Sequence, residues 1–290
     1  MQTVSIRGYE STELYDCPCP LLWQQQVGRK TGASLQVTLG CSHNKCKFCS
    51  MYNYLTFQPI PLEWIEDTLE DIAEKTPDVT VVRLQDGNPL ALPYEQLVSI
   101  LELIHQYLPA VTDVGCSTRV TDFRNKTPEQ LLRLRKLGVR QVSLGVESGD
   151  DWTLDRIEKG YHAADILEQC RKLDEAGIAY WMTFLNGAAG RSHSREHALH
   201  SAEIFSRCHP QLIGTGELIL FPNTALREEA DRGEFDPLTA EERTAELALF
   251  VEHLECDCIF ATNHPAAAAL CGENFLSRKA AIAAALRQAV

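Results

Sequence analysis

The stretch "SLQVTLGCSHNKCKFCSMY", residues 34–52, joins an alternating apolar run to a loop that carries Cys41, Cys46 and Cys49. The alternation predicts a strand over residues 35–39. Three thiols spaced C-x4-C-x2-C can close on one metal centre, as structural zinc, a two-iron cluster or a four-iron cluster. Structural zinc and two-iron clusters take four protein ligands, whereas a four-iron cluster held by three cysteines leaves one iron open for chemistry.

The composition limits the kind of protein that this chain can be. Its 290 residues are 44% hydrophobic, enough for one α/β barrel or two smaller domains with a large core. No signal-peptide pattern and no run of about 18 apolar residues is apparent, so we expect a cytoplasmic protein without a membrane partner. Its 11 cysteines then favour metal or redox chemistry over a disulfide framework. A net charge of −13 makes nucleic acid an unexpected partner.

Six β-rich runs alternate with segments of helical periodicity along the chain. The runs are residues 35–39, 79–84, 111–115, 140–146, 178–185 and 212–220. Thr127 and Gln130 predict a capping box for one intervening helix, which Gly138 ends. This repeat is typical of βα units that feed a parallel sheet. It predicts a partial (β/α)6 TIM-type barrel with a C-terminal helical extension; a doubly wound open sheet is the alternative.

The predicted units divide the chain into three parts. Residues 1–33 form an N-terminal extension, residues 34–225 the barrel core, and residues 226–290 a C-terminal extension packed on the core. Within that last part we expect a helix capped by Thr239 and Glu242, an extra strand near residues 257–261, and a final helix from Ser277.

A cluster of Gly, Cys or polar residues follows each of the six predicted strands. The clusters read "GCSHNKCKFC", "QDGNP", "CSTR", "ESG", "NGAAG" and "FPNT". Parallel α/β folds build their sites at the carboxyl ends of the strands, where loops and helix N-termini converge. The sequence therefore predicts a site at this edge of the sheet.

These residues resemble the radical SAM superfamily. Its usual hallmark is C-x3-C-x2-C on the loop after the first barrel strand, with an aromatic residue before the third cysteine, where this chain has Phe48 and one extra residue between Cys41 and Cys46. The segment "QDGNP" resembles the family's Gly-Gly-Glu-Pro segment, with Asn88 in place of the glutamate. "VSLGVESG", "DRIEKG", "NGAAG" and "FPNTAL" resemble segments of the coproporphyrinogen-dehydrogenase-like and cobalamin-linked branches.

The resemblance implies a [4Fe-4S] cluster on Cys41, Cys46 and Cys49, with S-adenosylmethionine bound to the open iron. Reductive cleavage of that cofactor gives a 5′-deoxyadenosyl radical, which abstracts hydrogen from a small organic substrate in lyase, decarboxylase, oxidoreductase or rearrangement chemistry. A modified nucleobase such as a 7-deazaguanine, a tetrapyrrole or an amino-acid derivative fits such a cavity. The residues expected to bind or surround the cofactor are Phe48, Asp86, Gly87, Asn88, Pro89, Ser117, Glu147, Ser148, Asn186 and Gly187.

Several residues have a second, purely structural interpretation. Glu217 and Cys116 are candidate catalytic residues facing the cavity, but a buried cysteine is more often a small core residue, and a glutamate can simply be paired inside the barrel. Glu147 lies near the adenosyl group or caps the helix that follows it.

Other cysteines and the electron source complete the expectations. An auxiliary iron-sulfur cluster has two candidate ligand groups, which are Cys256, Cys258 and Cys271, and Cys17 and Cys19. The alternative is that these residues are scattered thiols that bind no cluster. A flavodoxin or ferredoxin is the expected electron donor. The alternative function is an iron-sulfur electron-transfer or sensor protein that does not cleave S-adenosylmethionine.

Overall fold

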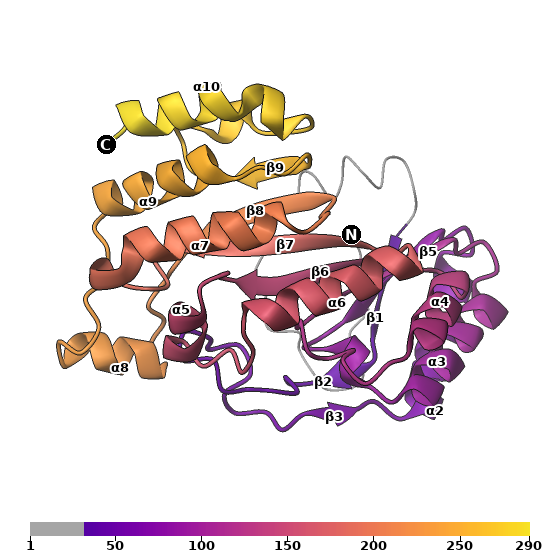
Figure 1. The fold of residues 1–290 in the computed structure, drawn as a ribbon. Helices are drawn as coiled ribbons and strands as arrows, with labels where there is room; N and C mark the ends of the chain where they lie inside the picture. The colour runs from indigo at the N-terminus through magenta and orange to yellow at the C-terminus, as the bar shows by residue number, and fades with distance from the viewer. Residues whose placement is uncertain (1–31) are drawn as a thin grey trace. The chain divides into compact units, whose positions relative to one another are not determined.

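The computed structural model describes residues 32–290 (Figure 1). Nearly all of the predicted N-terminal extension 1–33, with Cys17 and Cys19, lies outside the described residues. In the described chain, strands and helices alternate in the order that the sequence predicts.

The strands are β1 (Gly32–Gln36), β2 (Thr38–Leu39), β3 (Gln58–Pro59), β4 (Val81–Gln85), β5 (Asp113–Thr118), β6 (Val139–Glu147), β7 (Ala179–Asn186), β8 (Leu212–Glu217) and β9 (Ile259–Thr262). The α-helices are α2 (Leu62–Lys75), α3 (Tyr94–Tyr107), α4 (Pro128–Lys136), α5 (Asp151–Arg156), α6 (Ala163–Ala176), α7 (Ser194–Ser206), α8 (Ala225–Asp231), α9 (Ala240–His253) and α10 (Phe275–Gln288). The described part of the chain also has short 3-10 helices, η1 (Pro89–Ala91), η2 (Arg191–His193) and η3 (Ala268–Leu270).

Within residues 32–290, seven strands follow one another in the main sheet in the order β1-β4-β5-β6-β7-β8-β9, and β2 pairs with β3 separately. The β1/β4, β4/β5, β7/β8 and β8/β9 pairs are all parallel. All six predicted strands are present, and the suggested extra strand is β9. The fold class is therefore α/β, as predicted.

The chain forms two compact units, and the first comprises the described residues up to Ser42, Tyr54–Ser143 and Lys172–Ala179. Its sheet portion holds β1, β4 and β5, and α2, α3 and α4 each bury an apolar face. The predicted capping box of α4 is confirmed, since Thr127 and Gln130 exchange side-chain and main-chain hydrogen bonds. Gly138 follows this helix with φ +101°, a conformation that favours glycine.

The second unit comprises His43–Asn53, Leu144–Arg171 and Tyr180–Val290. Helix α9 packs between α7 and α10 (Figure 1). The rings of Phe184 and Phe250 stack with centroids 4.1 Å apart, and Phe250 also meets Phe205 edge-on. The predicted capping box of α9 is confirmed at Thr239 and Glu242. Residues beyond 225 thus contribute a strand and core helices to this unit.

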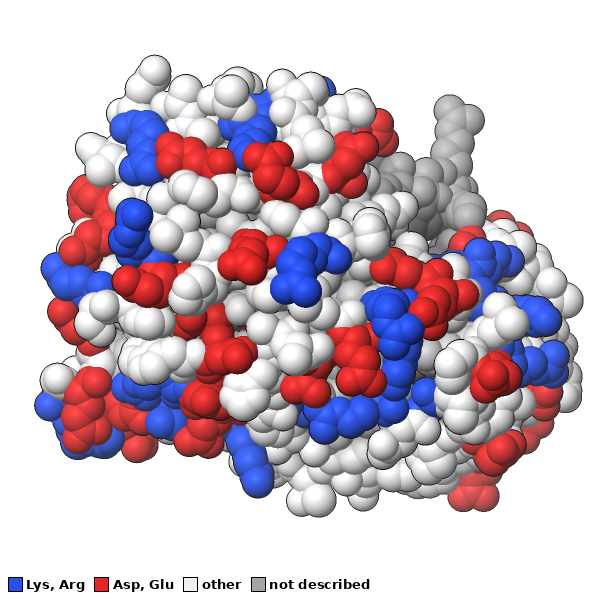
Figure 2. Space-filling view, in the orientation of Figure 1, with Lys and Arg blue, Asp and Glu red and all other residues white. Residues whose placement is uncertain are grey.

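The distribution of surface charge and the character of the helices bear on possible partners. On the face drawn in Figure 2, Lys and Arg side chains are interspersed with Asp and Glu. None of the helices in residues 32–290 combines the length and apolar character needed to cross a membrane.

Candidate functional site

In the first unit, two hydrogen bonds fix the residue that follows Cys41. The main-chain N–H of Ser42 donates to Asn88 Oδ1 over 2.7 Å, and its hydroxyl donates to Asp122 Oδ1 over 2.9 Å. The second oxygen of Asp122 accepts from Thr118 Oγ1 and from the main-chain N–H of Arg119. Asp122 therefore joins the loop after β5 to the start of the cysteine loop.

The predicted segment Asp86–Pro89 lies directly against the start of the cysteine loop. A Cβ added to Gly87 would lie 2.0 Å from the carbonyl oxygen of Gly40, so only glycine allows this approach of two backbones. Asp86 adopts φ +75° and accepts from Gln36 Nε2 over 3.0 Å. Asn88 is 3% exposed, and its oxygen already accepts from Ser42. Its predicted contact with the cofactor's ammonium group stays a prediction.

A buried lysine, Lys126, binds the main chain of the segment after Asn88. Pro89 is buried and begins η1, and Lys126 Nζ donates to the carbonyls of Leu90 and Leu92 over 2.7 and 3.0 Å. Burial lowers the pKa of Lys126, while the nearby Asp122 opposes that shift. The carbonyls give Lys126 the partners that a buried ammonium requires.

Cys116 and Ser117 are neighbours on β5 with opposite environments. Cys116 is 1% exposed, and burial raises the pKa of its thiol to about 12. Such a thiol stays protonated at neutral pH and packs as a small apolar group. Its predicted catalytic role stays a prediction, against which this burial counts. Ser117 is exposed and accepts a hydrogen bond from Arg83 Nη2 over 3.0 Å.

In the second unit, main-chain hydrogen bonds hold the part of the cysteine loop that carries Cys46 and Cys49. Lys47, which follows Cys46, donates its N–H to Ile157 O over 3.0 Å, and its carbonyl accepts from Leu226 N over 2.9 Å. The N–H of Cys49 donates to Cys46 O, which closes a turn. This half of the loop is therefore fixed to the end of α5 and to the start of α8.

An ion-pair cluster strengthens the same attachment. The Lys47 ammonium lies 2.9 Å from Glu229 Oε1 on α8, and Arg156 pairs with the other oxygen of Glu229. Burial pushes the pKa of Glu229 up, but the hydrogen bonds from Lys47 and Arg156 outweigh it and lower the pKa overall. Glu229 is therefore held as an anion by the cysteine loop and α5.

Phe48, the aromatic residue before Cys49, lies beside a buried lysine that our sequence analysis did not single out. Lys159 Nζ is 5.7 Å from the centre of the Phe48 ring and donates to Gly145 O over 2.8 Å. It also lies 3.5 Å from Glu147 Oε1, and Glu147 accepts from Thr183 Oγ1 over 3.0 Å. Glu147 has φ +68°, an uncommon conformation for a residue with a side chain. These contacts place Phe48 and Glu147 around one cation.

The turn after Glu147 shows that Glu147 is not the residue that caps the following helix. Asp150, and not Glu147, caps α5, because Asp150 Oδ2 accepts from Thr153 N over 2.8 Å. Ser148 is 0% exposed, and its hydroxyl accepts from Asp150 N over 3.0 Å. That Ser148 lies beside the cofactor stays a prediction, and its burial counts against direct contact with the cofactor.

Three predicted residues at the ends of β7 and β8 all bind helix α9. Asn186 Nδ2 donates to the carbonyl of Arg243 over 2.9 Å, and the N–H of Gly187 donates to Glu246 Oε2. Glu217 Oε2 accepts from Arg243 Nε over 3.1 Å. The structure therefore brings Asn186, Gly187 and Glu217 together through a helix from beyond residue 225.

The carboxylate of Glu246 is shielded from solvent. Its Oε1 lies 3.1 Å from Nδ1 of His197, and both side chains are 0% exposed. The His197 ring stacks on Phe184, with centroids 4.8 Å apart. Sequence reasoning missed this pair because His197 and Glu246 are separated by 49 residues and meet only in the fold.

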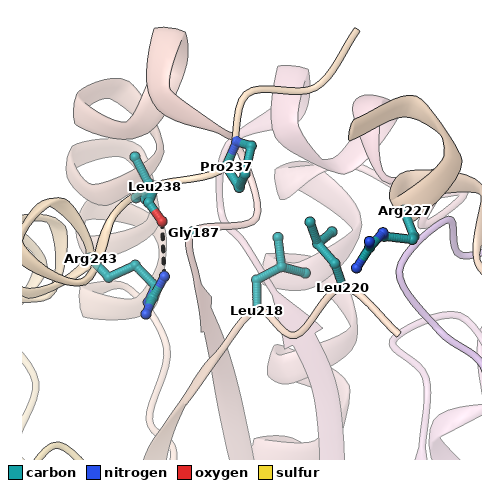
Figure 3. A pocket seen from close by; sticks show the side chains of 7 residues that line it. All are labelled: Gly187, Leu218, Leu220, Arg227, Pro237, Leu238 and Arg243. Atoms are coloured by element: carbon teal, nitrogen blue, oxygen red, sulfur yellow. Dashed lines mark hydrogen bonds between the residues drawn. The ribbon is translucent and has the colours of Figure 1, made fainter. Parts of the chain in front are cut away.

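A pocket of about 360 Å³ opens beside these residues (Figure 3). Its lining consists of Gly187, the apolar side chains Leu218, Leu220, Pro237 and Leu238, and the side chains of Arg227 and Arg243. Figure 3 shows Arg243 hydrogen-bonded to Leu238 on one side and Arg227 on the other side, next to Leu220. The pocket lies at the carboxyl ends of β7 and β8, the edge where the sequence predicts a site.

The thiols of the cysteine loop differ in exposure from most of the others. Cys41, Cys46 and Cys49 are half-buried, as is Cys271, whereas Cys116, Cys170, Cys208, Cys256 and Cys258 are buried. Thiols that reach a loop surface suit an iron-sulfur cluster, whose iron is held by thiolates. In residues 32–290 no three His, Cys, Asp or Glu side chains have the geometry to hold a metal ion. Ligation by the three loop cysteines, and an auxiliary cluster, stay predictions.

Comparisons with known proteins agree with these features. A sequence profile of the radical SAM superfamily matches residues 35–203. The heme chaperone HemW of Bacillus subtilis is 24% identical over 216 residues, which cover 71% of this chain and 55% of HemW. The anaerobic magnesium-protoporphyrin IX monomethyl ester cyclase of Cereibacter sphaeroides is 27% identical over 170 residues, 57% of this chain and 27% of the cyclase. The chain spans about half the length of the HemW relatives that it matches.

Among solved structures, the radical S-adenosylmethionine methyltransferase TsrM of Kitasatospora setae, with cobalamin and a [4Fe-4S] cluster bound, superposes with a TM-score of 0.56. The two are 19% identical over 70% of this chain and 40% of TsrM, so the likeness concerns the fold. It bears out the partial TIM-type barrel that the sequence predicts. Because the family profile covers more than half of the residues, the chain belongs to the radical SAM superfamily, whose cofactors are a [4Fe-4S] cluster and S-adenosylmethionine.

Proposed function

We propose that this protein is a radical SAM enzyme that acts on a small organic substrate, as a lyase or an oxidoreductase. The observation that carries the proposal is the cysteine loop: a C-x4-C-x2-C stretch with three half-buried thiols, in a chain that belongs to this superfamily. Cys41, Cys46 and Cys49 would hold the cluster, and the segment Asp86–Pro89 would hold the methionine end of the cofactor.

The cofactors supply the bond-breaking chemistry when they are bound. One electron, from a donor such as a flavodoxin or ferredoxin, passes through the cluster and cleaves the carbon-sulfur bond of S-adenosylmethionine, which gives methionine and a 5′-deoxyadenosyl radical that takes a hydrogen atom from the substrate. The protein's part is to position groups and exclude water. Ser42, bound to Asn88 and Asp122, fixes the backbone beside Cys41, and Lys47 does the same beside Cys46.

The test is an anaerobic assay for 5′-deoxyadenosine. The protein is reconstituted with iron and sulfide, reduced with dithionite and given S-adenosylmethionine, and the product is measured by mass spectrometry. We expect the wild type to form 5′-deoxyadenosine and Cys46→Ala to lose both the product and the cluster's absorbance. Cys271→Ala is the matched control, because Cys271 is also half-buried but lies outside the loop.

The outcomes separate the proposal from its alternative. A loaded cluster that neither binds nor cleaves S-adenosylmethionine would contradict the proposal and leave an iron-sulfur electron-transfer or sensor protein. Loss of iron in Cys271→Ala as well as in Cys46→Ala would indicate an auxiliary cluster.

The names of two relatives favour a tetrapyrrole as one candidate ligand. HemW is named a heme chaperone and the cyclase acts on a magnesium porphyrin ester. If this chain binds heme without chemistry, heme added to the protein would shift its absorbance spectrum, and 5′-deoxyadenosine formation would not depend on heme. If a tetrapyrrole is the substrate, its addition would increase 5′-deoxyadenosine formation.

A further inference from the structure

The pocket between the end of β8 and the α8–α9 connection has a lining with two chemical characters. Leu218, Leu220, Pro237 and Leu238 provide apolar walls, and the charged side chains of the lining are two arginines. Its volume of about 360 Å³ lies at the small end of the range of about 300–1,000 Å³ that is usual for small-molecule sites. An apolar pocket with a few polar groups on its wall is the usual form of such a site.

Each of the two arginines is held on one edge and open on the other. Arg243 donates from Nε to Glu217 and from Nη1 to the carbonyl of Leu238, over 3.1 and 2.9 Å. Arg227 donates from Nε to both oxygens of Asp231, over 2.9 and 3.1 Å. Within residues 32–290, Nη2 of Arg243 and both Nη atoms of Arg227 donate no hydrogen bond to another protein group.

We propose that this pocket binds an organic carboxylate with an apolar body, with Arg243 and Arg227 recognising the carboxylate. The proposal rests on the proposed function, because it names the substrate class of that enzyme. A guanidinium binds a carboxylate through two parallel charge-assisted hydrogen bonds, which are stronger than neutral ones. The leucines and the proline take the apolar body out of water.

Glu217 gains a different role from the one that the sequence predicts. Its carboxylate, together with the carbonyl of Leu238, holds the Arg243 side chain in one orientation. A side chain that is already fixed loses little conformational entropy when a ligand binds. Glu217 is therefore a positioning residue for Arg243 and does not itself contact the carboxylate.

The pocket is also tied to the cysteine loop within the second unit. Leu226, the residue before Arg227, donates its N–H to the carbonyl of Lys47, next to Cys46. Lys47 also pairs with Glu229 on the same helix. Helix α8 therefore fixes Arg227 relative to the half of the loop that carries Cys46 and Cys49.

The experiment is a calorimetric titration of the cluster-loaded protein, without oxygen, with 4-phenylbutyrate and with its neutral analogue 4-phenylbutanamide. We expect the acid to bind at least about tenfold more tightly than the amide, because only the carboxylate is an anion that offers two acceptor oxygens to a guanidinium. Arg227→Gln and Arg243→Gln are each expected to weaken binding of the acid about tenfold and to weaken binding of the amide by less. Arg232→Gln is the matched control, because Arg232 is bound to Glu234 and lies outside the lining.

Three results would overturn the proposal. The first is equal affinity for the acid and the amide. The second is that both arginine variants bind the acid as tightly as Arg232→Gln does. The third is competition between S-adenosylmethionine and the acid for the pocket. Arg227→Gln gives an answer even if Arg243→Gln fails to fold, because within residues 32–290 the side chain of Arg227 hydrogen-bonds only to Asp231, on its own helix. Binding of the acid without 5′-deoxyadenosine formation would contradict the proposed function alone, so the two failures are distinguishable.

Discussion

Ser42 illustrates how single residues fix the backbone of the cysteine loop. Its main chain and its hydroxyl are bound by Asn88 and Asp122, which come from the ends of two different strands. An iron-sulfur cluster needs its thiolates in a fixed arrangement, and hydrogen bonds around the ligands tune it. We therefore expect Asp122 to act through Ser42 on the position of Cys41.

A double-mutant cycle between Ser42 and Asp122 tests this role. We expect Ser42→Ala and Asp122→Ala to couple by about 1 kcal/mol in the free energy of unfolding, the usual contribution of one hydrogen bond. Both single variants should also retain less iron after reconstitution and change the EPR spectrum of the reduced cluster. The measurements are urea unfolding, iron content and EPR.

The control cycle pairs Ser42→Ala with Asp67→Ala, an exposed residue on α2. That pair should be additive, because no contact links the two side chains. Coupling near zero between Ser42 and Asp122, with unchanged iron content, would show that this hydrogen bond has no influence on the loop.

The sequence predicts some residues of the candidate site and misses others for a physical reason. Phe48 and Asn88 are predicted as cofactor-binding residues because each lies in a motif formed by its neighbours in the sequence. Asp122 and Lys159 acquire their roles from contacts with residues 80 and 14 positions away, at Ser42 and Gly145. Such roles depend on tertiary contacts, which a local pattern does not contain.

At the scale of elements, helix α9 is the clearest addition to the predicted site. Glu246 on α9 accepts from the N–H of Gly187 at the end of β7 and meets His197 of α7. The sequence predicts the helix from its capping box at Thr239, but this pattern gives no sign of what its buried face binds. One carboxylate joins three elements at the edge where the cofactor is expected.

Glu246→Gln tests whether this carboxylate holds the end of β7. A glutamine side chain has one acceptor oxygen, so it cannot accept from both Gly187 N and a protonated His197 Nδ1 as the two carboxylate oxygens do. We expect the free energy of unfolding to fall by about 1–3 kcal/mol, because a buried polar group is left without a partner. Urea unfolding measures the loss, and hydrogen exchange of the Gly187 amide should become faster.

Glu203→Gln on α7 is the matched control, since Glu203 is exposed. It should leave both measurements as in the wild type. Equal stability of the Glu246 and Glu203 variants would mean that the buried carboxylate is dispensable for this edge of the sheet.

For the whole molecule, the open question is whether residues 226–290 are an added extension, as the sequence predicts. The strand order and the parallel β8/β9 pairing make β9 of this part of the chain a strand of the main sheet. Its weak sequence signal has a physical cause, because β9 is four residues long and α10 is rich in alanine. Neither element shows the strong periodicity that identifies α2.

Substitutions at two neighbouring residues of α10 test whether residues 226–290 unfold together with the rest of the second unit. Phe275 is 0% exposed and meets the ring of Phe260 on β9 at 4.9 Å, whereas Leu276 is 45% exposed. If the segment belongs to the cooperative core, Phe275→Ala should lower the free energy of unfolding by about 3–5 kcal/mol, because it leaves a cavity. Leu276→Ala should change it by less than about 0.5 kcal/mol. Urea unfolding followed by circular dichroism and by tryptophan fluorescence measures both. A Phe275→Ala protein whose main transition keeps its midpoint, with a separate early loss of helix, would instead support a peripheral extension, since only α10 would then have come apart.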